Sequence, residues 1–235
     1  MNNRHYTEIA FVLDRSGSMQ SCRDAAITGF NQFLAEQQMA EGLAKLTLVL
    51  FDNEYLVPVR SIPVSEVVPL DTTTYVPRNT TALLDAIGQT IDDLGSDLAA
   101  RDEKNRPGQI IVAIFTDGLE NASERFTLKE VAAKIEHQTD AYKWTFLFLG
   151  ANQDAIATAA QMNIGAANAA TYAADGPGAR SAHRSFARKV SALRASSLGE
   201  ASVAEQADAA APMSEILAEE DKKQRGSSKA GGKSK

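Results

Sequence analysis

Three short stretches of the sequence carry oxygen-bearing side chains that could bind a cation. Asp14, Ser16 and Ser18 alternate with single residues in the first stretch, a hydroxyl of Thr80 or Thr81 lies in the second, and Asp117 lies in the third. Two carboxylates and three hydroxyls, without a thiolate or an imidazole, form the ligand set that a hard cation such as Mg²⁺ prefers. These residue types therefore predict a site for a divalent cation, Mg²⁺ or Mn²⁺.

Each stretch lies where a predicted strand ends or a predicted helix begins. Asp14 directly follows the apolar run 9–13, Asp117 comes just after the apolar run 110–115, and Thr81 opens a helical pattern. In an open sheet of parallel strands, ligands bind outside the carboxyl ends of the strands, where the direction of winding reverses. We therefore expect the three stretches to meet in one crevice at that edge of the sheet.

The fold class follows from the alternation of strand and helix patterns. Continuous apolar runs, typical of buried parallel strands, alternate with segments of helical periodicity. Only three residues separate 46–51 from 55–59, which favours an antiparallel hairpin at one edge. We predict an α/β fold with a doubly wound, mostly parallel central sheet flanked by helices and one antiparallel edge strand. The expected strands are 9–13, 46–51, 55–59, 110–115, 145–149 and 169–173, and the expected helices are 24–38, one from 81, one from the Thr127/Glu130 capping box, 152–162 and 179–198.

Composition divides the chain into three parts. We expect one α/β domain over 5–175 and a C-terminal helix over 176–198 that packs on the domain or extends it. Residues 199–235 are rich in Ala and Glu, then in Lys, Gly and Ser, so we expect them to be disordered for lack of apolar surface. The basic side chains of the C-terminal helix favour a solvent-exposed face, with docking on the acidic body as the alternative. These side chains are Arg180, Arg184, Arg188, Lys189 and Arg194.

Charge separates the body of the protein from its end. The net charge is −6, but six basic residues and no acid follow residue 221, so the first 221 residues carry −12. An acidic body disfavours nucleic-acid binding because backbone phosphates repel it. Contact with nucleic acid is therefore expected, if at all, through the basic segment 222–235, as an alternative function.

The remaining composition favours a cytoplasmic protein. Hydrophobic residues make up 44% of the chain and charged residues 23%, and no apolar run approaches the roughly 18–20 residues needed to span a bilayer. The first ten residues are polar and lead directly into a strand pattern, so no secretory signal and no membrane association is expected. Cys22 is the only cysteine, which is compatible with a reducing compartment.

The three stretches together resemble a known family. The segment Asp14-Arg15-Ser16-Gly17-Ser18-Met19, with Thr81 before Ala-Leu-Leu-Asp-Ala-Ile and Asp117 within Phe-Thr-Asp-Gly, is similar to the metal-ion-dependent adhesion site (MIDAS) of the von Willebrand factor A (vWA) family. The similarity covers about 5–175 and is strongest to bacterial or phage-type intracellular members. It implies a Rossmann-like vWA fold that contains this metal site.

The resemblance also implies how the site works. Ser16 and Ser18 would bind the metal directly, Thr81 would bind it when a ligand is engaged, and Asp14 and Asp117 would act mainly through water. An acidic side chain of a protein partner would fill the open coordination position, and an ATPase or a multi-protein assembly is the expected kind of partner. Thr80 is the rival of Thr81, although the Ala-Leu that follows favours Thr81.

Other functions fit the sequence less well. An aspartyl-phosphate phosphatase would need a second acid two residues after Asp14, where Ser16 stands. Neither a Gly-x-Ser-x-Gly elbow nor a phosphate-binding P-loop is present, so we expect no enzymatic activity. The bland alternative is that the aspartates and serines are ordinary caps and turn residues. Glu120 and Asn121 are expected either on the rim of the site or in a surface turn.

Overall fold

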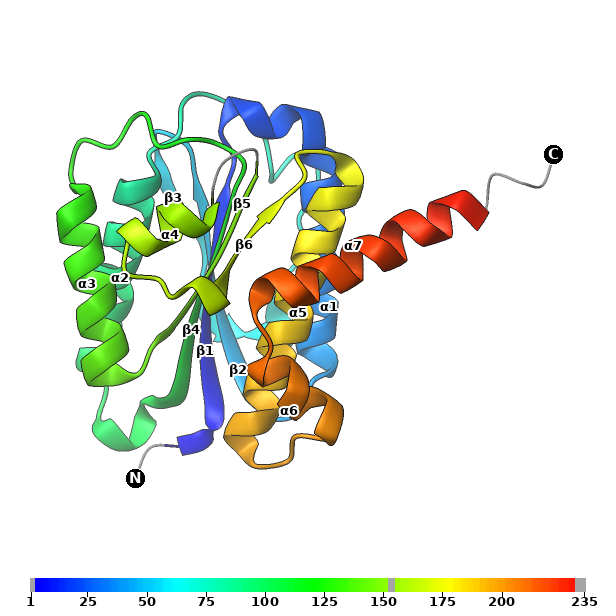
Figure 1. Cartoon of the computed structure of the whole chain (residues 1–235). Helices are drawn as coiled ribbons and strands as arrows, with labels where there is room; N and C mark the ends of the chain where they lie inside the picture. Colours follow the sequence, from blue (N-terminus) through cyan, green and yellow to red (C-terminus); the bar gives the residue numbers. More distant parts are fainter. Residues whose placement is uncertain (1–2, 152–154, 231–235) are drawn as a thin grey trace.

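A six-stranded sheet forms the centre of the protein (Figure 1). The computed structural model describes residues 3–151 and 155–230. The strands are β1 (Asn3–Asp14), β2 (Leu43–Phe51), β3 (Tyr55–Pro63), β4 (Pro107–Thr116), β5 (Thr145–Ala151) and β6 (Ala169–Tyr172), arranged in the order β3-β2-β1-β4-β5-β6. Among the strands of the described residues, only the β2–β3 pair is antiparallel. The predicted fold class, with its antiparallel edge strand, is confirmed.

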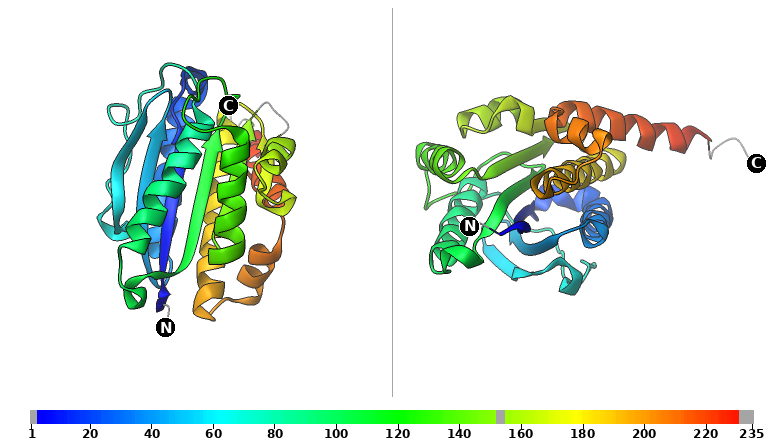
Figure 2. Two further views of the ribbon diagram at one scale, coloured as in Figure 1. Left: turned by 90° about the vertical axis from the view of Figure 1, so that its left-hand side faces the viewer. Right: turned by 90° about the horizontal axis from the view of Figure 1, so that it is seen from below.

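Helices cover both faces of the sheet (Figures 1 and 2). One face carries α2 (Leu83–Ala99), α3 (Leu128–Tyr142) and α4 (Ala155–Gln161). The other carries α1 (Arg23–Met39), α5 (Gly176–Leu198) and α7 (Met213–Ala230), with the short α6 (Val203–Ala210) beside α5. The capping box predicted at the start of α3 is present, since the Thr127 side chain accepts from the Glu130 amide and the Glu130 carboxylate accepts from the Thr127 amide.

The two central strands position the candidate site. Side chains 9–13 of β1 and 111–115 of β4 are fully buried, because a helical layer covers each face. Leu13 lies beside Phe115 in the parallel register, so Asp14 and Thr116 emerge together at the carboxyl edge. The direction of winding reverses between β1 and β4, which is where an open α/β sheet forms its ligand crevice.

The basic side chains of α5 do not form a simple solvent-exposed face. Arg194 is almost fully buried, and its guanidinium donates to the main-chain oxygens of Gln37 (2.8 Å) and Gly42 (2.9 Å). Lys189 is also buried and donates to the carbonyls of Ala209 and Ala211, both at 2.7 Å. The expectation of exposure is wrong for these two cations, which instead satisfy carbonyl groups at the ends of α1 and α6.

The prediction of disorder over 199–235 is wrong for residues 203–230, which form α6 and α7. The apolar residues are few, but Met213, Ile216 and Leu217 lie on one face of α7 and are buried against the body. Ion pairs from Arg188 to Asp208, Glu219 and Glu220 also hold both helices. The average composition of this segment does not reveal that its few apolar side chains come together on one face of a helix. Residues 231–235 lie outside the described part of the chain.

Across residues 3–151 and 155–230, no helix combines the length and apolar character needed to cross a membrane.

Candidate metal centre

Asp14 is the innermost residue of the candidate site. It ends β1 and has no exposed surface. Its Oδ1 accepts from the Ser16 amide at 2.6 Å and its Oδ2 accepts from the Thr116 hydroxyl at 2.6 Å. The bond to Thr116 is the direct result of the β1–β4 register. The carboxylate is therefore oriented by neutral donors from two strand ends.

Ser16, Ser18 and Asp117 form a chain of oxygens above Asp14. The two serine hydroxyls are 3.1 Å apart, and the Ser18 hydroxyl donates to Asp117 Oδ1 at 2.5 Å. Ser16 is buried, Asp117 is partly buried and Ser18 is exposed. The chain of oxygens thus runs from the protein interior to the surface, where an ion or a partner has access.

Thr81 closes the site from the loop before α2. A Cβ atom built on Gly118 would lie 2.6 Å from Thr81 Oγ1 and 3.4 Å from Asp14 Oδ2, so both oxygens face this glycine. Thr81 is buried, whereas Thr80 is exposed. The geometry therefore favours Thr81 over Thr80 as the inward-facing hydroxyl. The structure brings all five predicted residues together, while their role as metal ligands stays a prediction.

Glu120 and Asn121 brace the site from behind. Asn121 accepts from the Thr81 amide at 2.9 Å, and its own amide donates to the Thr81 carbonyl at 3.0 Å. Glu120 accepts from the Leu84 amide at 2.9 Å, which satisfies a free donor at the start of α2. Both residues join the Thr81 loop to the Asp117 loop. The surface-turn role left open by the sequence is also present, since Glu120 accepts from the amides of Ala122 (3.0 Å) and Ser123 (2.8 Å) in the turn that follows it.

Sequence reasoning missed the residues that hold the Asp14 loop from the opposite side. Tyr75 is fully buried and its hydroxyl donates to the Asp14 carbonyl at 2.5 Å. Asp52, also fully buried, lies 3.2 Å from the Arg15 guanidinium and accepts from Arg78 at 2.9 Å. No local pattern marks these residues, because each bond joins segments that are far apart in sequence.

Gly17 lies where two loops of the site approach each other closely. The backbone turns at Gly17, which begins a short 3-10 helix, and the Met19 amide donates to the Ser16 carbonyl at 3.0 Å, but this turn does not use a positive φ at Gly17. Its amide donates to the Asn79 carbonyl at 3.0 Å, and a Cβ atom at Gly17 would lie only 3.2 Å from that oxygen. Asn79 itself has a φ of 59°, which asparagine tolerates well. Close approach of the two loops is therefore what requires the glycine.

The two carboxylates of the site, Asp14 and Asp117, have no positively charged partner among the described residues. Burial raises the pKa of Asp14 to about 6, although bonds from Thr116 and Ser16 partly oppose this shift. Burial also raises the pKa of Asp117. Neither carboxylate forms an ion pair with any residue in the described part of the chain. An added cation would remove the cost of burying these charges.

The donor set fits a hard cation better than zinc. Within the described residues, no group of three or more His, Cys, Asp or Glu side chains is placed to hold a metal. The candidate centre instead combines two carboxylates with three hydroxyls, all of them oxygen donors suited to Mg²⁺ or Mn²⁺. With five side chains, water or a ligand from outside could complete an octahedral set.

Sequence comparison finds no match, whereas structural comparison finds proteins that share the fold. No family profile and no curated protein sequence matches the chain. A von Willebrand factor type A protein from Catenulispora acidiphila superposes with a TM-score of 0.53 and 14% identity, over 80% of this chain and 43% of that one. The protein has the vWA fold.

Other solved vWA-like structures agree on this architecture. Proximal thread matrix protein 1 from the mussel byssus matches at 13% identity, with a TM-score of 0.54 over 77% of this chain and 45% of that chain. The manganese-loaded TRAP protein of Plasmodium vivax matches at 14% identity, with a TM-score of 0.53 over 75% of this chain and 71% of that chain. The present vWA fold spans less than half the length of the mussel and Catenulispora proteins.

Proposed function

We propose that this vWA fold is a metal-dependent protein-binding module. Mg²⁺ or Mn²⁺ would be held by Asp14, Ser16, Ser18, Thr81 and Asp117. The observation that carries the proposal is the pair of carboxylates at the crevice, one of them fully buried, which no described cation neutralises. Two structural neighbours support it, since TRAP is manganese-loaded and the mussel protein has a zinc-occupied MIDAS motif.

The bound metal would present an open coordination position to a carboxylate of a protein partner. The accessible Ser18 supports this arrangement, as does Leu119, which lies two residues after Asp117 and is 65% exposed. An exposed apolar side chain beside a cation suits a protein surface that offers an acid next to an apolar group. We further propose a cytoplasmic, bacterial or phage-type intracellular member, whose partner is an ATPase or a component of a multi-protein assembly.

The proposal includes the absence of catalysis. Both Asp14 oxygens already accept hydrogen bonds, and the side chain is buried, which disfavours its use as a phosphoryl nucleophile. Nucleic-acid binding through 222–235 is also less favoured than protein binding. Arg225 pairs with Asp175 and Asp221, and Lys223 pairs with Glu220, so part of the tail's charge is neutralised internally.

Calorimetric titration with Mg²⁺ and with Mn²⁺ tests the metal site. The wild type should bind one ion saturably, and Asp14→Ala and Ser16→Ala should lose that binding. Asp24→Ala is the matched control, because Asp24 is a nearby carboxylate whose side chain is 82% exposed and already paired with Arg23. Absence of saturable binding to the wild type, or retention of binding by Asp14→Ala, would refute the metal site.

Selection from a random peptide library, with Mg²⁺ present, tests the partner chemistry. The enriched peptides should contain Asp or Glu, and replacing that acid by its amide should abolish binding. Chelation with EDTA should have the same effect on the wild type. Enriched peptides that bind equally well as amides would contradict the carboxylate mechanism, even if the metal itself binds.

A further inference from the structure

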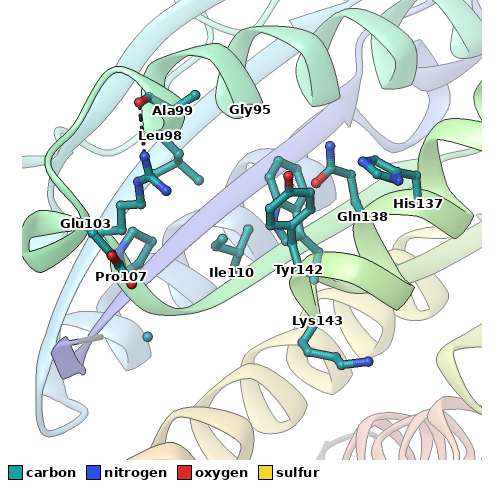
Figure 3. Close-up of a pocket in the computed structure, with 13 residues that line it drawn as sticks. Gly95, Leu98, Ala99, Glu103, Pro107, Ile110, His137, Gln138, Tyr142 and Lys143 are labelled. Atoms are coloured by element: carbon teal, nitrogen blue, oxygen red, sulfur yellow. Dashed lines mark hydrogen bonds between the residues drawn. The ribbon is translucent and has the colours of Figure 1, made fainter. Parts of the chain in front are cut away.

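A cavity of about 410 Å³ opens at the amino edge of the sheet, the edge opposite Asp14 (Figure 3). It lies between the C-terminal ends of α2 and α3, over the first residues of β4. Its volume falls within the range of about 300–1,000 Å³ that is usual for small-molecule sites. Nothing in the metal-binding proposal uses this cavity.

The cavity exists because the two helices do not close over the sheet. Ile110 belongs to a central strand, yet its side chain is only partly buried. In Figure 3 it lies between Leu98 of α2 and Tyr142 of α3. Gly95 of α2 contributes no side chain, and a Cβ atom there would meet only the Gln138 amide nitrogen, at 3.8 Å. A larger residue at position 95 would therefore fill the space.

Aromatic side chains form one wall of the cavity. Tyr142 ends α3, is 60% exposed, and packs edge-on against His137 with ring centroids 5.5 Å apart. Trp144, the only tryptophan in the chain, also lines the cavity and is buried. Leu98 and Pro107 add apolar surface. This lining suits a flat, apolar ring, which would stack on or beside aromatic groups.

Arg106 supplies a fixed cation to the same cavity. Its guanidinium donates to the carbonyls of Arg101 and Ala99, each at 3.1 Å, at the end of α2. These contacts hold the side chain in place but bring no negative charge. Within the described residues Arg106 joins no ion pair, and the acid on the cavity wall, Glu103, is exposed. A held guanidinium with no carboxylate partner favours an anionic ligand group.

We propose that this cavity binds a planar aromatic carboxylate. The ring would occupy the space over Ile110 beside Tyr142, and the carboxylate would pair with Arg106. The inference does not depend on the metal centre, so it can be tested with metal-free protein.

The test uses 2-naphthoate as the probe and Trp144 fluorescence as the readout. Because Trp144 is the only tryptophan, a saturable change in its emission reports on this cavity. The wild type should bind 2-naphthoate about tenfold more tightly than the neutral 2-naphthamide, since a charge-assisted bond is lost with the amide. Arg106→Gln should remove that preference. Lys104→Gln, which changes an exposed cation outside the cavity, should preserve it.

Gly95→Leu tests the location of the ligand. Leucine favours a helix more than glycine does, so this variant should keep its melting temperature while losing the fluorescence response. Tyr142→Ala, which changes a largely exposed side chain, is a second variant that should weaken binding without unfolding the protein. No saturable response in the wild type, equal affinity for acid and amide, or normal binding by folded Gly95→Leu would each overturn the proposal.

Discussion

Two buried carboxylates of β1, one inside the strand and one at its end, differ in how their charge is balanced. Glu8, inside the strand, and Asp14, at the carboxyl edge, are both fully buried. Glu8 lies 3.1 Å from the Arg101 guanidinium and accepts bonds from the hydroxyls of Tyr6 and Ser61. Asp14 receives bonds only from neutral donors, and its pKa is raised to about 6.

Glu8 is therefore a structural acid, whereas Asp14 is a candidate metal ligand. A buried carboxylate with a guanidinium partner contributes to the fold as it stands, because its charge is neutralised within the chain. A buried carboxylate without such a partner costs stability whenever it is ionised. Asp14 belongs to the second kind, which is why we assign its counter-charge to an ion from outside.

The largest expected effect on folding comes from Glu8→Gln. The change leaves Arg101, whose side chain is only 23% exposed, without its carboxylate. We expect the free energy of unfolding to fall by about 2–3 kcal/mol, measured by urea denaturation, with metal binding unchanged. Glu103→Gln, at an exposed position, should have almost no effect. Equal stability of Glu8→Gln and the wild type would break the comparison.

Asp14→Asn should give the opposite pattern. Metal affinity should fall by about 100-fold or more, which corresponds to about 2.7 kcal/mol. In EDTA, however, the variant should be as stable as the wild type or more stable, because an uncompensated buried charge has been removed. Calorimetry and urea denaturation measure the two effects. Destabilisation in EDTA as large as that of Glu8→Gln would make Asp14 a structural acid too.

The pH dependence of metal stabilisation sharpens the same contrast. The pKa of Asp14 is about 6 in the folded protein and near 4 when the chain is unfolded. Protonation of Asp14 therefore stabilises the metal-free folded protein, and this contribution to the free energy of unfolding is complete only below about pH 4. That contribution is lost as the pH rises through about 6, where the carboxylate becomes available to metal. The rise in melting temperature caused by Mg²⁺ should therefore be larger at about pH 7.5 than at about pH 5. Asp14→Asn should show no such gain, and an equal Mg²⁺ effect at both pH values in the wild type would contradict it.

The smallest expected effect is a difference between the adjacent residues Thr81 and Thr80 in their contribution to peptide binding. Thr81→Ala should weaken binding of a selected acidic peptide by about five- to tenfold, because one hydroxyl is lost at the ligand-engaged metal. Its effect on metal affinity alone should be smaller. Thr80→Ala is the matched control and should change neither, since Thr80 is exposed. Equal losses of metal and peptide binding in Thr81→Ala would contradict the division of roles among the ligands.

Local patterns predicted much of the fold and of the candidate site. Apolar runs such as 9–13 and 110–115 indicated buried strands, and the polar residues directly after them indicated the edge where a ligand would bind. The capping box at Thr127 was likewise predicted from the four residues 127–130 alone. The predictions of buried strands and of the helix cap are confirmed, because strand burial and helix capping depend on residues that are neighbours in sequence. Ligand binding at that edge stays a prediction.

Predictions from average composition were less successful. Residues 199–230 contain few apolar side chains, yet Met213, Ile216 and Leu217 come together on one face of α7 and find a site on the body. The charges of Lys189 and Arg194 likewise suggested exposure, whereas carbonyls at helix ends bind both side chains. Such anchoring depends on which distant groups a side chain meets, and periodicity does not reveal that.

The sequence by itself determined the order of strands and helices as far as residue 198 and the three stretches that hold the oxygen-bearing residues of the candidate centre, because these follow from residue type and short-range spacing. Only the tertiary structure decided that Tyr75, Asn121 and Asp52 would brace the loops of that centre. It also decided that Glu8 would meet a guanidinium and Asp14 would not. Charge balance in the interior is a property of three-dimensional neighbours, and those neighbours are set by the register and packing of the whole sheet.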